Sequence, residues 1–340
     1  MIDISAIRIY PYGLAVAGAV LIGLFWARAL CARRGLAAQT VSVFAVLALP
    51  LSFLCARLLY CLICLDGFSR QGLAYFFDFT GGGYTLFGAL LGGVLALALT
   101  ARRTRQPWGR IADALCAPAA LVVALGRLAE GLVGQGYGWY VEDWFDPMNG
   151  MSLFHPEEFD GLLRFPFAVQ DMYGEWSWAV FVLEALLALV IGALALRRGE
   201  GRRPGDTALR ALLNLCAAQI LCESLRQDAV LRFGFVRVSQ VLGAAVAVAL
   251  LVYGCLRMER PIPARVAVPV VGTLASAGVV VAMEFALEKK IVLLEALPMD
   301  VCYLLTALAC LGLVKSVGAA LRAPRRAAKP VTDTKEEGTR

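Results

Sequence analysis

The chain has 340 residues, of which 60% are hydrophobic and 17% are charged, and its formal net charge is +6. A soluble domain is usually about half apolar and about a quarter charged, so the composition argues against one. The basic excess does not indicate a nucleic-acid-binding protein, because the arginines cluster at the ends of apolar runs, where they determine membrane topology. The opening segment, Met1 to Arg8, is short and carries Asp3, which is unlike a cleavable signal peptide.

Apolar runs recur along most of the chain at the length of roughly 20 residues that lets a helix cross the hydrocarbon of a bilayer. We therefore expect an all-α fold, a polytopic transmembrane helical bundle of about nine spans. The spans are predicted near 10–30, 40–64, 84–101, 112–133, 177–196, 207–225, 236–256, 266–286 and 296–317.

Arginines are concentrated in every second connection, after the first, third, fifth, seventh and ninth predicted spans. Connections rich in arginine face the cytoplasm, so the pattern predicts an outside N-terminus and a cytoplasmic C-terminus. The connection over 134–176 is then extracytoplasmic, and it is long and acidic. A loop of this length usually carries a function or structure of its own, and the alternative is a small exposed cap with solvated acids. The polar end of the chain, 321–340, is predicted to be a disordered cytoplasmic tail.

Cysteine and histidine usage argues against a metal or redox centre. The ten cysteines lie mostly inside apolar runs, where cysteine serves as a small apolar residue. Cys61 and Cys64 form a C-x-x-C, but no βαβ pattern accompanies it. His155 is the single histidine of the chain, which excludes a multi-histidine site, so we expect no metal ligands and no cofactor.

Ionisable residues inside membrane spans are costly and usually mark function. Arg127 and Glu130 are three residues apart, as are Glu223 and Arg226, so each pair shares a helix face. The pairs could simply neutralise each other and pin helices together. The alternative is an arginine-lined site for an anion such as a lipid phosphate, which the planar guanidinium fork suits. Other ionisable or polar residues in the spans are Arg57, Tyr60, Asp113 and Glu184.

Glycines form two groups. Those around the third span, from Gly81 to Gly93, are explained by close helix packing. Those from Gly134 to Gly138 lie where a helix is predicted to end, and there glycine also permits backbone contact with a ligand.

Seven short segments follow one another in an order that matches a known enzyme family. They are Tyr12-Gly13-Leu14, Ala56 to Tyr60 (ARLLY), Asp78 to Gly93 (DFTGGGYTLFGALLGG), Asp113 to Arg127 (DALCAPAALVVALGR), Gly126 to Gly136 (GRLAEGLVGQG), Phe165 to Val169 (FPFAV), and Glu223 to Gln227 (ESLRQ) with Ser239-Gln240. Over about residues 8–256 the chain thereby resembles the prolipoprotein diacylglyceryl transferase family.

The resemblance implies a multi-pass enzyme of the bacterial plasma membrane that acts in lipoprotein maturation. It implies transfer of a diacylglyceryl group from phosphatidylglycerol to the lipobox cysteine thiol in a prolipoprotein signal peptide, with glycerol 1-phosphate as the leaving group. The family-like membrane domain is then 1–260, and 261–320 is an appended pair of transmembrane helices. By position, the catalytic residues are Arg127, Glu130 and Arg226, and the substrate-binding residues are Tyr12, Arg57, Tyr60, Gln135, Glu223 and Gln240.

The chain departs from the family pattern at several positions. The family histidine falls on Phe87, the signature asparagine on Glu130 and the signature glutamate on Gln135. The motif before the fifth span is reduced to Val182-Leu183-Glu184, and His155-Pro156 is a candidate substitute for its histidine. Two hypotheses follow: a transferase that uses Glu130 as its base, or a catalytically degenerate relative that binds phospholipid or a partner protein. A transporter is disfavoured, because no inverted repeat is present.

Overall fold

Nine helices in the described part of the chain are long and apolar enough to span a membrane, and they confirm the predicted all-α bundle. The computed structural model describes residues 2–4, 7–79, 82–145, 161, 163–171, 173–197, 203–228, 231–233, 236–258, 263–294 and 296–322. The spans are α1 (Pro11–Arg33), α2 (Gln39–Ile63), α5 (Leu86–Thr104), α6 (Trp108–Glu130), α8 (Val180–Arg197), α9 (Asp206–Leu225), α10 (Val238–Leu256), α11 (Pro263–Leu287) and α12 (Met299–Arg322). The predicted tail beyond 322 and His155 lie outside the described residues.

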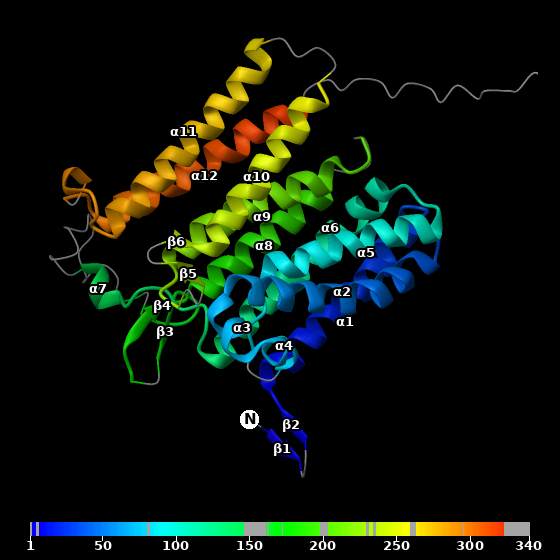
Figure 1. Ribbon diagram of the computed structural model, residues 1–340, viewed down its shortest axis with the longest axis horizontal. Coiled ribbons are helices and arrows are strands. Elements are labelled where there is room, and N and C mark those ends of the chain that lie inside the picture. Colours follow the sequence, from blue (N-terminus) through cyan, green and yellow to red (C-terminus); the bar gives the residue numbers. More distant parts are fainter. Residues whose placement is uncertain are drawn as a thin grey trace, which may run out of the picture.

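Short elements that the sequence did not predict precede the first span or connect the spans. Three antiparallel two-stranded sheets occur among the described residues: β1 (Ile2–Ile4) with β2 (Ile7–Ile9), β3 (Ala168–Gln170) with β4 (Trp176–Trp178), and β5 (Arg232–Phe233) with β6 (Val236–Arg237). The short helices are α3 (Leu65–Gln71), α4 (Leu73–Phe77), η1 (Gly131–Val133), α7 (Val141–Phe145) and η4 (Val292–Leu294). Figure 1 shows α7, β3–β4 and β5–β6 gathered at one end of the bundle. The described parts of the 134–176 connection thus have structure of their own.

The helices α2 and α5 form the most closely packed pair, and small residues on α5 make this possible. A Cβ atom at Gly88 would lie 2.5 Å from the carbonyl oxygen of Cys55 and 2.6 Å from the Cα of Ala56. A Cβ at Gly92 would meet the α2 backbone at Leu51 and Ser52 in the same way. The packing explanation of the third-span glycines is therefore confirmed at these two positions.

The centre of the bundle consists of α6, α8 and α9, and a carboxylate joins two of them at the end remote from the sheets. Asp113 on α6 accepts hydrogen bonds from the backbone amides of Gly205 at 2.7 Å and Ala208 at 2.8 Å. These amides lie in the first turn of α9, where unpaired N–H groups favour an anion. Asp113 is therefore a helix cap supplied from a neighbouring helix.

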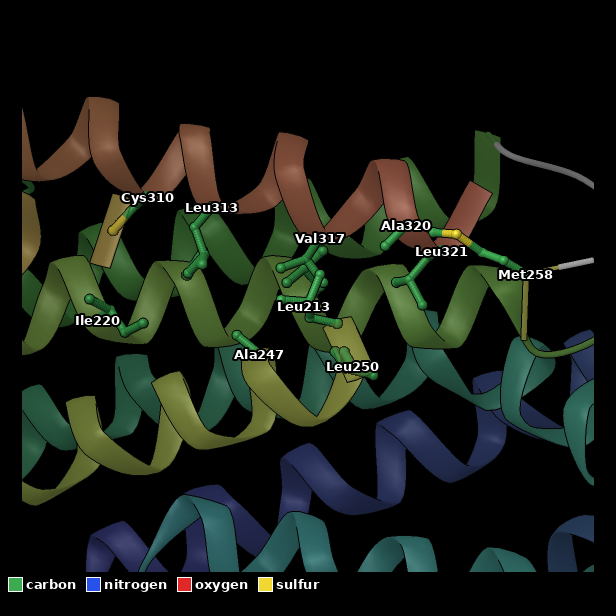
Figure 2. Packing of buried hydrophobic residues seen from close by; sticks show 12 residues of the cluster. Leu213, Ile220, Ala247, Leu250, Met258, Cys310, Leu313, Val317, Ala320 and Leu321 are labelled. Atoms are coloured by element: carbon green, nitrogen blue, oxygen red, sulfur yellow. The ribbon is translucent and has the colours of Figure 1, made fainter. Parts of the chain in front are cut away.

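The last two helices pack onto α9 and α10. The largest apolar cluster joins α9, α10 and α12, and Figure 2 shows its side chains between the three ribbons. Gly254 on α10 allows this approach, because a Cβ there would lie 2.9 Å from the carbonyl carbon of Ala320. The helix α11 packs mainly against α12. The buried members of the cluster are Leu213, Ala217, Ile220, Ala247, Leu250, Leu251, Met258, Cys310, Leu313, Val317, Ala320 and Leu321.

We expect Gly88→Ala to lower the thermal stability of the purified protein, because the new methyl group must push α5 away from the α2 backbone. Overpacking of this kind costs about 1–3 kcal/mol. Gly93→Ala is the matched control, since the nearest atom to a Cβ there is the Ser52 hydroxyl at 3.8 Å. The measurement is the midpoint of thermal unfolding in detergent, and equal midpoints for the two variants would contradict the packing argument.

Candidate functional site

Arg127 lies three residues before the end of α6 and joins three helices through its side chain. Its Nη1 donates to Glu130 Oε1 at 2.5 Å, on the same helix face. Its Nε pairs with Glu184 Oε2 on α8 at 2.9 Å, and its Nη2 donates to Gln219 Oε1 on α9 at 2.7 Å. The predicted face-sharing of Arg127 and Glu130 is therefore an actual ion pair.

Arg226 directly follows α9 and reaches the same two glutamates. Its Nη1 lies 3.0 Å from Glu130 Oε2 and 3.4 Å from Glu184 Oε2. Its Nε and Nη2 donate to the two carboxylate oxygens of Asp228 at 2.9 and 3.1 Å. Glu223, the acid that shares its spacing in the sequence, is buried but makes no ion pair with Arg226 within the described chain. The helix ends at Leu225 and the backbone of Arg226 is extended, so Glu223 and Arg226 do not share a helix face as their spacing implies.

The two guanidinium groups are therefore bridged by two carboxylates in a nearly dry environment, with Glu184 only 4% exposed. The cluster contains two arginines and three carboxylates, from Glu130, Glu184 and Asp228, so its formal charge is 2 − 3 = −1. Charges buried in this way are tolerated only when they are paired and hydrogen-bonded. Chemically, the arrangement provides two convergent forked cations for an oxyanion, with carboxylates close enough to accept a proton.

The segment after α6 brings its backbone against this cluster, and glycine is required there. Gly136 has a φ of +77°, a left-handed conformation that side chains disfavour. Its amide donates to Asp228 Oδ2 at 2.6 Å, and a Cβ at this position would lie 3.0 Å from Glu130 Oε2. Gly138 pairs with Arg226 through an isolated antiparallel bridge. The glycines that the sequence places at a helix end thus let the chain pass beside the ion pairs.

Three further predicted residues differ in their position relative to the cluster. Tyr12, in the first turn of α1, is 37% exposed and lies within electrostatic range of Glu130 and both arginines. Gln135 is exposed, next to the positive-φ glycines. Glu223 is buried one turn before the end of α9. The structure therefore brings Tyr12 to the cluster, while Gln135 lies on the surface.

Arg57 has a different environment from the one predicted for a substrate-binding residue. It is 2% exposed, and its guanidinium donates to five backbone carbonyls, those of Tyr75, Phe76, Asp78, Gly82 and Gly83. Its guanidinium carbon also lies 5.6 Å from the centre of the Tyr60 ring. All three of its nitrogens are occupied by the segment between α2 and α5, so Arg57 organises that segment and has no free donor for a lipid.

Gln240 joins helices rather than facing the arginines. Its Nε2 lies 2.8 Å from Ser224 Oγ, 2.7 Å from Glu284 Oε1 and 3.1 Å from the Ile220 carbonyl. Ser224 also donates to Glu284. These three side chains, Ser224, Gln240 and Glu284, form a second polar cluster that connects α9, α10 and α11. Glu284 is an acid inside a span, a signal by which the sequence alone could have identified it.

Phe87, where the sequence resemblance would put the family histidine, is buried in the first turn of α5. Its ring packs near Gly243 on α10, with its Cζ 3.5 Å from where a Cβ would stand. This position therefore supplies an apolar contact between α5 and α10 and no proton-transfer group.

A cavity of about 460 Å³ lies outside the cluster and shares Asp228 with it. Its other side is formed by the turn between β3 and β4, where Asp171 accepts hydrogen bonds from the amides of Tyr173 and Glu175 and from the Tyr140 hydroxyl. Desolvation, the largest single contribution, raises the pKa of Asp171, but these hydrogen bonds together outweigh it, so the pKa lies below its usual value. The same contact raises the pKa of Tyr140. Asp171 is therefore an anionic anchor of the turn beside the cavity.

Asp228 and Gln219 complete the cluster but were not predicted. Asp228 follows the recognised ESLRQ segment by one residue, so an acid two positions from Arg226 was an available signal. Gln219 has no comparable signal, since an amide inside a helix is commonplace. No group of three or more histidine, cysteine or acidic side chains suited to a metal ion occurs among the residues that the structure describes.

Comparison with known proteins gives a consistent result. The model of the prolipoprotein diacylglyceryl transferase family matches residues 1–256. A phosphatidylglycerol–prolipoprotein diacylglyceryl transferase of Shouchella clausii is 28% identical over 267 residues, covering 76% of this chain and 91% of that protein. The enzyme of the same name from Symbiobacterium thermophilum is 26% identical over 260 residues, covering 76% of this chain and 92% of the relative. The match of the family model ends at the last residue of α10, so α11 and α12 lie beyond it.

We expect Gly136→Ala to disrupt the cluster, because the methyl group meets both the Glu130 carboxylate and Phe181 at a backbone conformation that alanine disfavours. Gly134→Ala is the matched control: its φ is also positive, at +68°, but the space around it is open. The free energy of unfolding of the control should fall only by the cost of the strained backbone conformation, about 1 kcal/mol or somewhat more. Thermal unfolding of the two purified variants measures the difference, and a control as damaged as Gly136→Ala would show that backbone strain alone is responsible.

Proposed function

The chain belongs to the prolipoprotein diacylglyceryl transferase family, and we propose that it transfers a diacylglyceryl group from phosphatidylglycerol to the lipobox cysteine of a prolipoprotein. Relatives of this name match about three quarters of the chain and over nine tenths of their own length. The observation that carries the proposal is the convergence of Arg127 and Arg226 on the same two carboxylates. On the proposed topology this cluster lies toward the outer side of the plasma membrane, where a multi-pass protein meets secreted precursors.

We propose that the lipid phosphodiester binds by replacing a carboxylate. Each nitrogen of the two guanidinium groups already contacts a side-chain acceptor, so a phosphate that takes the place of Glu130 or Glu184 meets donors that are aligned for an oxyanion. Glu130 is the better candidate, because each of its oxygens contacts one arginine and because it is the last residue of α6, next to the positive-φ glycines Gly134 and Gly136. A phosphodiester carries the same single charge and the same two-oxygen fork as a carboxylate, so it preserves the arginine contacts.

The released carboxylate is then the base that the reaction requires. The cysteine thiol gives its proton to Glu130, and its sulfur attacks the glyceryl carbon that bears the phosphate ester. The carbon–oxygen bond breaks, a thioether forms, and glycerol 1-phosphate leaves with the bonding electron pair on its oxygen. Arg127 and Arg226 stabilise the charge that develops on this departing phosphate. Tyr12 is proposed to line the same site, which the electrostatic effect of Glu130, Arg127 and Arg226 on its hydroxyl supports.

The alternative is a relative that binds phospholipid or a partner protein without turnover. The specific observation that favours it is the buried Phe87 at the position of the family histidine. The two proposals separate in one experiment: purified chain is incubated with phosphatidylglycerol and a lipobox peptide, and the peptide mass is followed. Mass increase by one diacylglyceryl group supports the transferase, whereas unmodified peptide with a well-folded, lipid-binding protein favours the alternative.

Arg127→Gln and Arg226→Gln should each lower the rate of peptide modification by about 10²- to 10³-fold, the usual effect of removing one donor to a developing oxyanion. Arg257→Gln is the matched control, because Arg257 stacks on Tyr253, its guanidinium carbon 4.5 Å from the ring centre, at the other end of α10. The control should retain the wild-type rate. Full activity in Arg127→Gln would remove the arginine from the proposed mechanism.

Glu130→Gln separates binding from catalysis. The amide cannot accept the thiol proton and competes less strongly for the arginines, so turnover should be lost while phosphatidylglycerol binds at least as tightly as in the wild type. Glu142→Gln, on the exposed side of α7, provides a control of the same chemistry. Turnover by initial rate and lipid binding by native mass spectrometry are the two readouts. A Glu130→Gln protein that loses lipid binding in parallel with turnover would contradict carboxylate exchange.

A further inference from the structure

Arg237 is a third arginine in this part of the protein, and its surroundings differ from those of Arg127 and Arg226. It ends β6 and precedes α10, and it is 3% exposed. Its Nη1 donates to the backbone carbonyl of Arg226 at 3.2 Å. Its Nε has no hydrogen-bond partner, and no carboxylate of the described residues pairs with it within 4.0 Å. A buried guanidinium without a paired anion is costly, so its retention calls for a compensating group.

A cavity of about 210 Å³ adjoins this side chain. It lies between β6, the end of α11 and the start of α12, and Arg237 and Lys289 both line it. Glu288 is the one acid among the described lining residues, so the three charged side chains described there sum to 2 − 1 = +1. Trp139 and Tyr303 form aromatic walls, and the remaining lining is apolar or sulfur-containing. At roughly 30 Å³ per water molecule, the volume accommodates a phosphoryl group with a small substituent.

Arg232 adds to the positive character of the same place. It is the direct register partner of Arg237 in the β5–β6 pair, and its buried Nε also lacks a hydrogen-bond partner among the described atoms. Burial and the charge of Arg237 lower the pKa of Arg232, and the charges of Glu288, Glu223 and Glu284 only partly offset this effect. Neither of these two neighbouring guanidinium groups has an ion pair within 4.0 Å among the described residues.

Helix capping explains part of this arrangement. The carbonyl of Arg226 lies at the C-terminal end of α9, where the helix dipole favours a cation, and Arg237 donates to it. This contact uses one N–H of a group that has five. It leaves the Nε unsatisfied, and it does not explain why Lys289 of another helix end lines the same cavity.

We propose that this cavity binds a phosphoryl anion through Arg237 and Lys289. The guanidinium supplies the forked donors that phosphate prefers, and Glu288 is suited to accept a hydrogen bond from a hydroxyl on the same molecule. The apolar lining from the ends of α11 and α12 suits carbon atoms attached to the phosphate. The anion is either a phospholipid head group or a soluble phosphate ester. The site lies outside the Arg127–Glu184 contacts and does not depend on the proposed transfer reaction.

The test is direct binding to the purified full-length chain. Phosphatidylglycerol is titrated and counted by native mass spectrometry, and glycerol 1-phosphate and inorganic phosphate are titrated by calorimetry. Arg237→Gln should lower the affinity for one bound anion by about ten- to a hundredfold, the effect of losing a charge-assisted contact. Lys289→Ala should weaken the same anion, and Arg257→Gln should leave it unchanged. Binding of phosphatidylglycerol alone identifies a lipid head group, and binding of the soluble probes identifies a phosphate ester.

Two outcomes would overturn the site. The first is that each probe binds the wild type, Arg237→Gln and Lys289→Ala with the same affinity. Arg237 would then be a helix cap only. The second is that the wild type binds none of the probes. If Arg237→Gln fails to fold, Lys289→Ala at the rim decides the question. The proposed transferase site is judged separately, because Arg127→Gln should abolish peptide modification without changing the anion held at Arg237.

Discussion

A guanidinium group buried among membrane-spanning helices needs an acceptor for each of its N–H groups, and this requirement organises the centre of the protein. Arg127 and Arg226 pair their nitrogens with carboxylates from the end of α6, the start of α8 and the segment after α9, and Arg127 also with the Gln219 amide. Removal of any partner would leave a buried charge unpaired in a medium of low dielectric constant, which is costly. The ends of these helices are therefore fixed relative to one another, and the glycine segment must pass through the narrow space that remains.

The same requirement assigns different roles to the buried arginines. Arg57 satisfies its donors with five backbone carbonyls, which neutralise no charge but hold the connection between α2 and α5 in place. Arg127 and Arg226 use carboxylates, which an anionic substrate is able to replace because the charge is conserved. Arg237 has one carbonyl and no paired carboxylate in the described chain, so it has the greatest unmet demand for an anion.

The spans were predictable because hydropathy and helix length are local properties, and so was the Arg127–Glu130 pair, which one helix face determines. The partners of Arg226 were not, because Glu130 is 96 residues away and Glu184 is 42 residues away. The carbonyl partners of Arg57 were not predictable for a related reason: backbone carbonyls accept hydrogen bonds whatever residues carry them, so no sequence pattern reports them. The small sheets were missed because strands of two or three residues show no periodicity.

The two helices beyond the family match bear on the site through α9. A pair at the edge of a membrane bundle needs only apolar packing, which α12 already has against α9 and α10. Glu284 and Tyr303 add polar contacts: the carboxylate accepts from Ser224 and Gln240, and the Tyr303 hydroxyl donates to the Ser224 carbonyl. A carboxylate in a span is retained only where it has such partners. Since Ser224 is two residues before Arg226, the added helices support the last turn of α9, and hence the position of one of the two arginines on which the proposed chemistry depends.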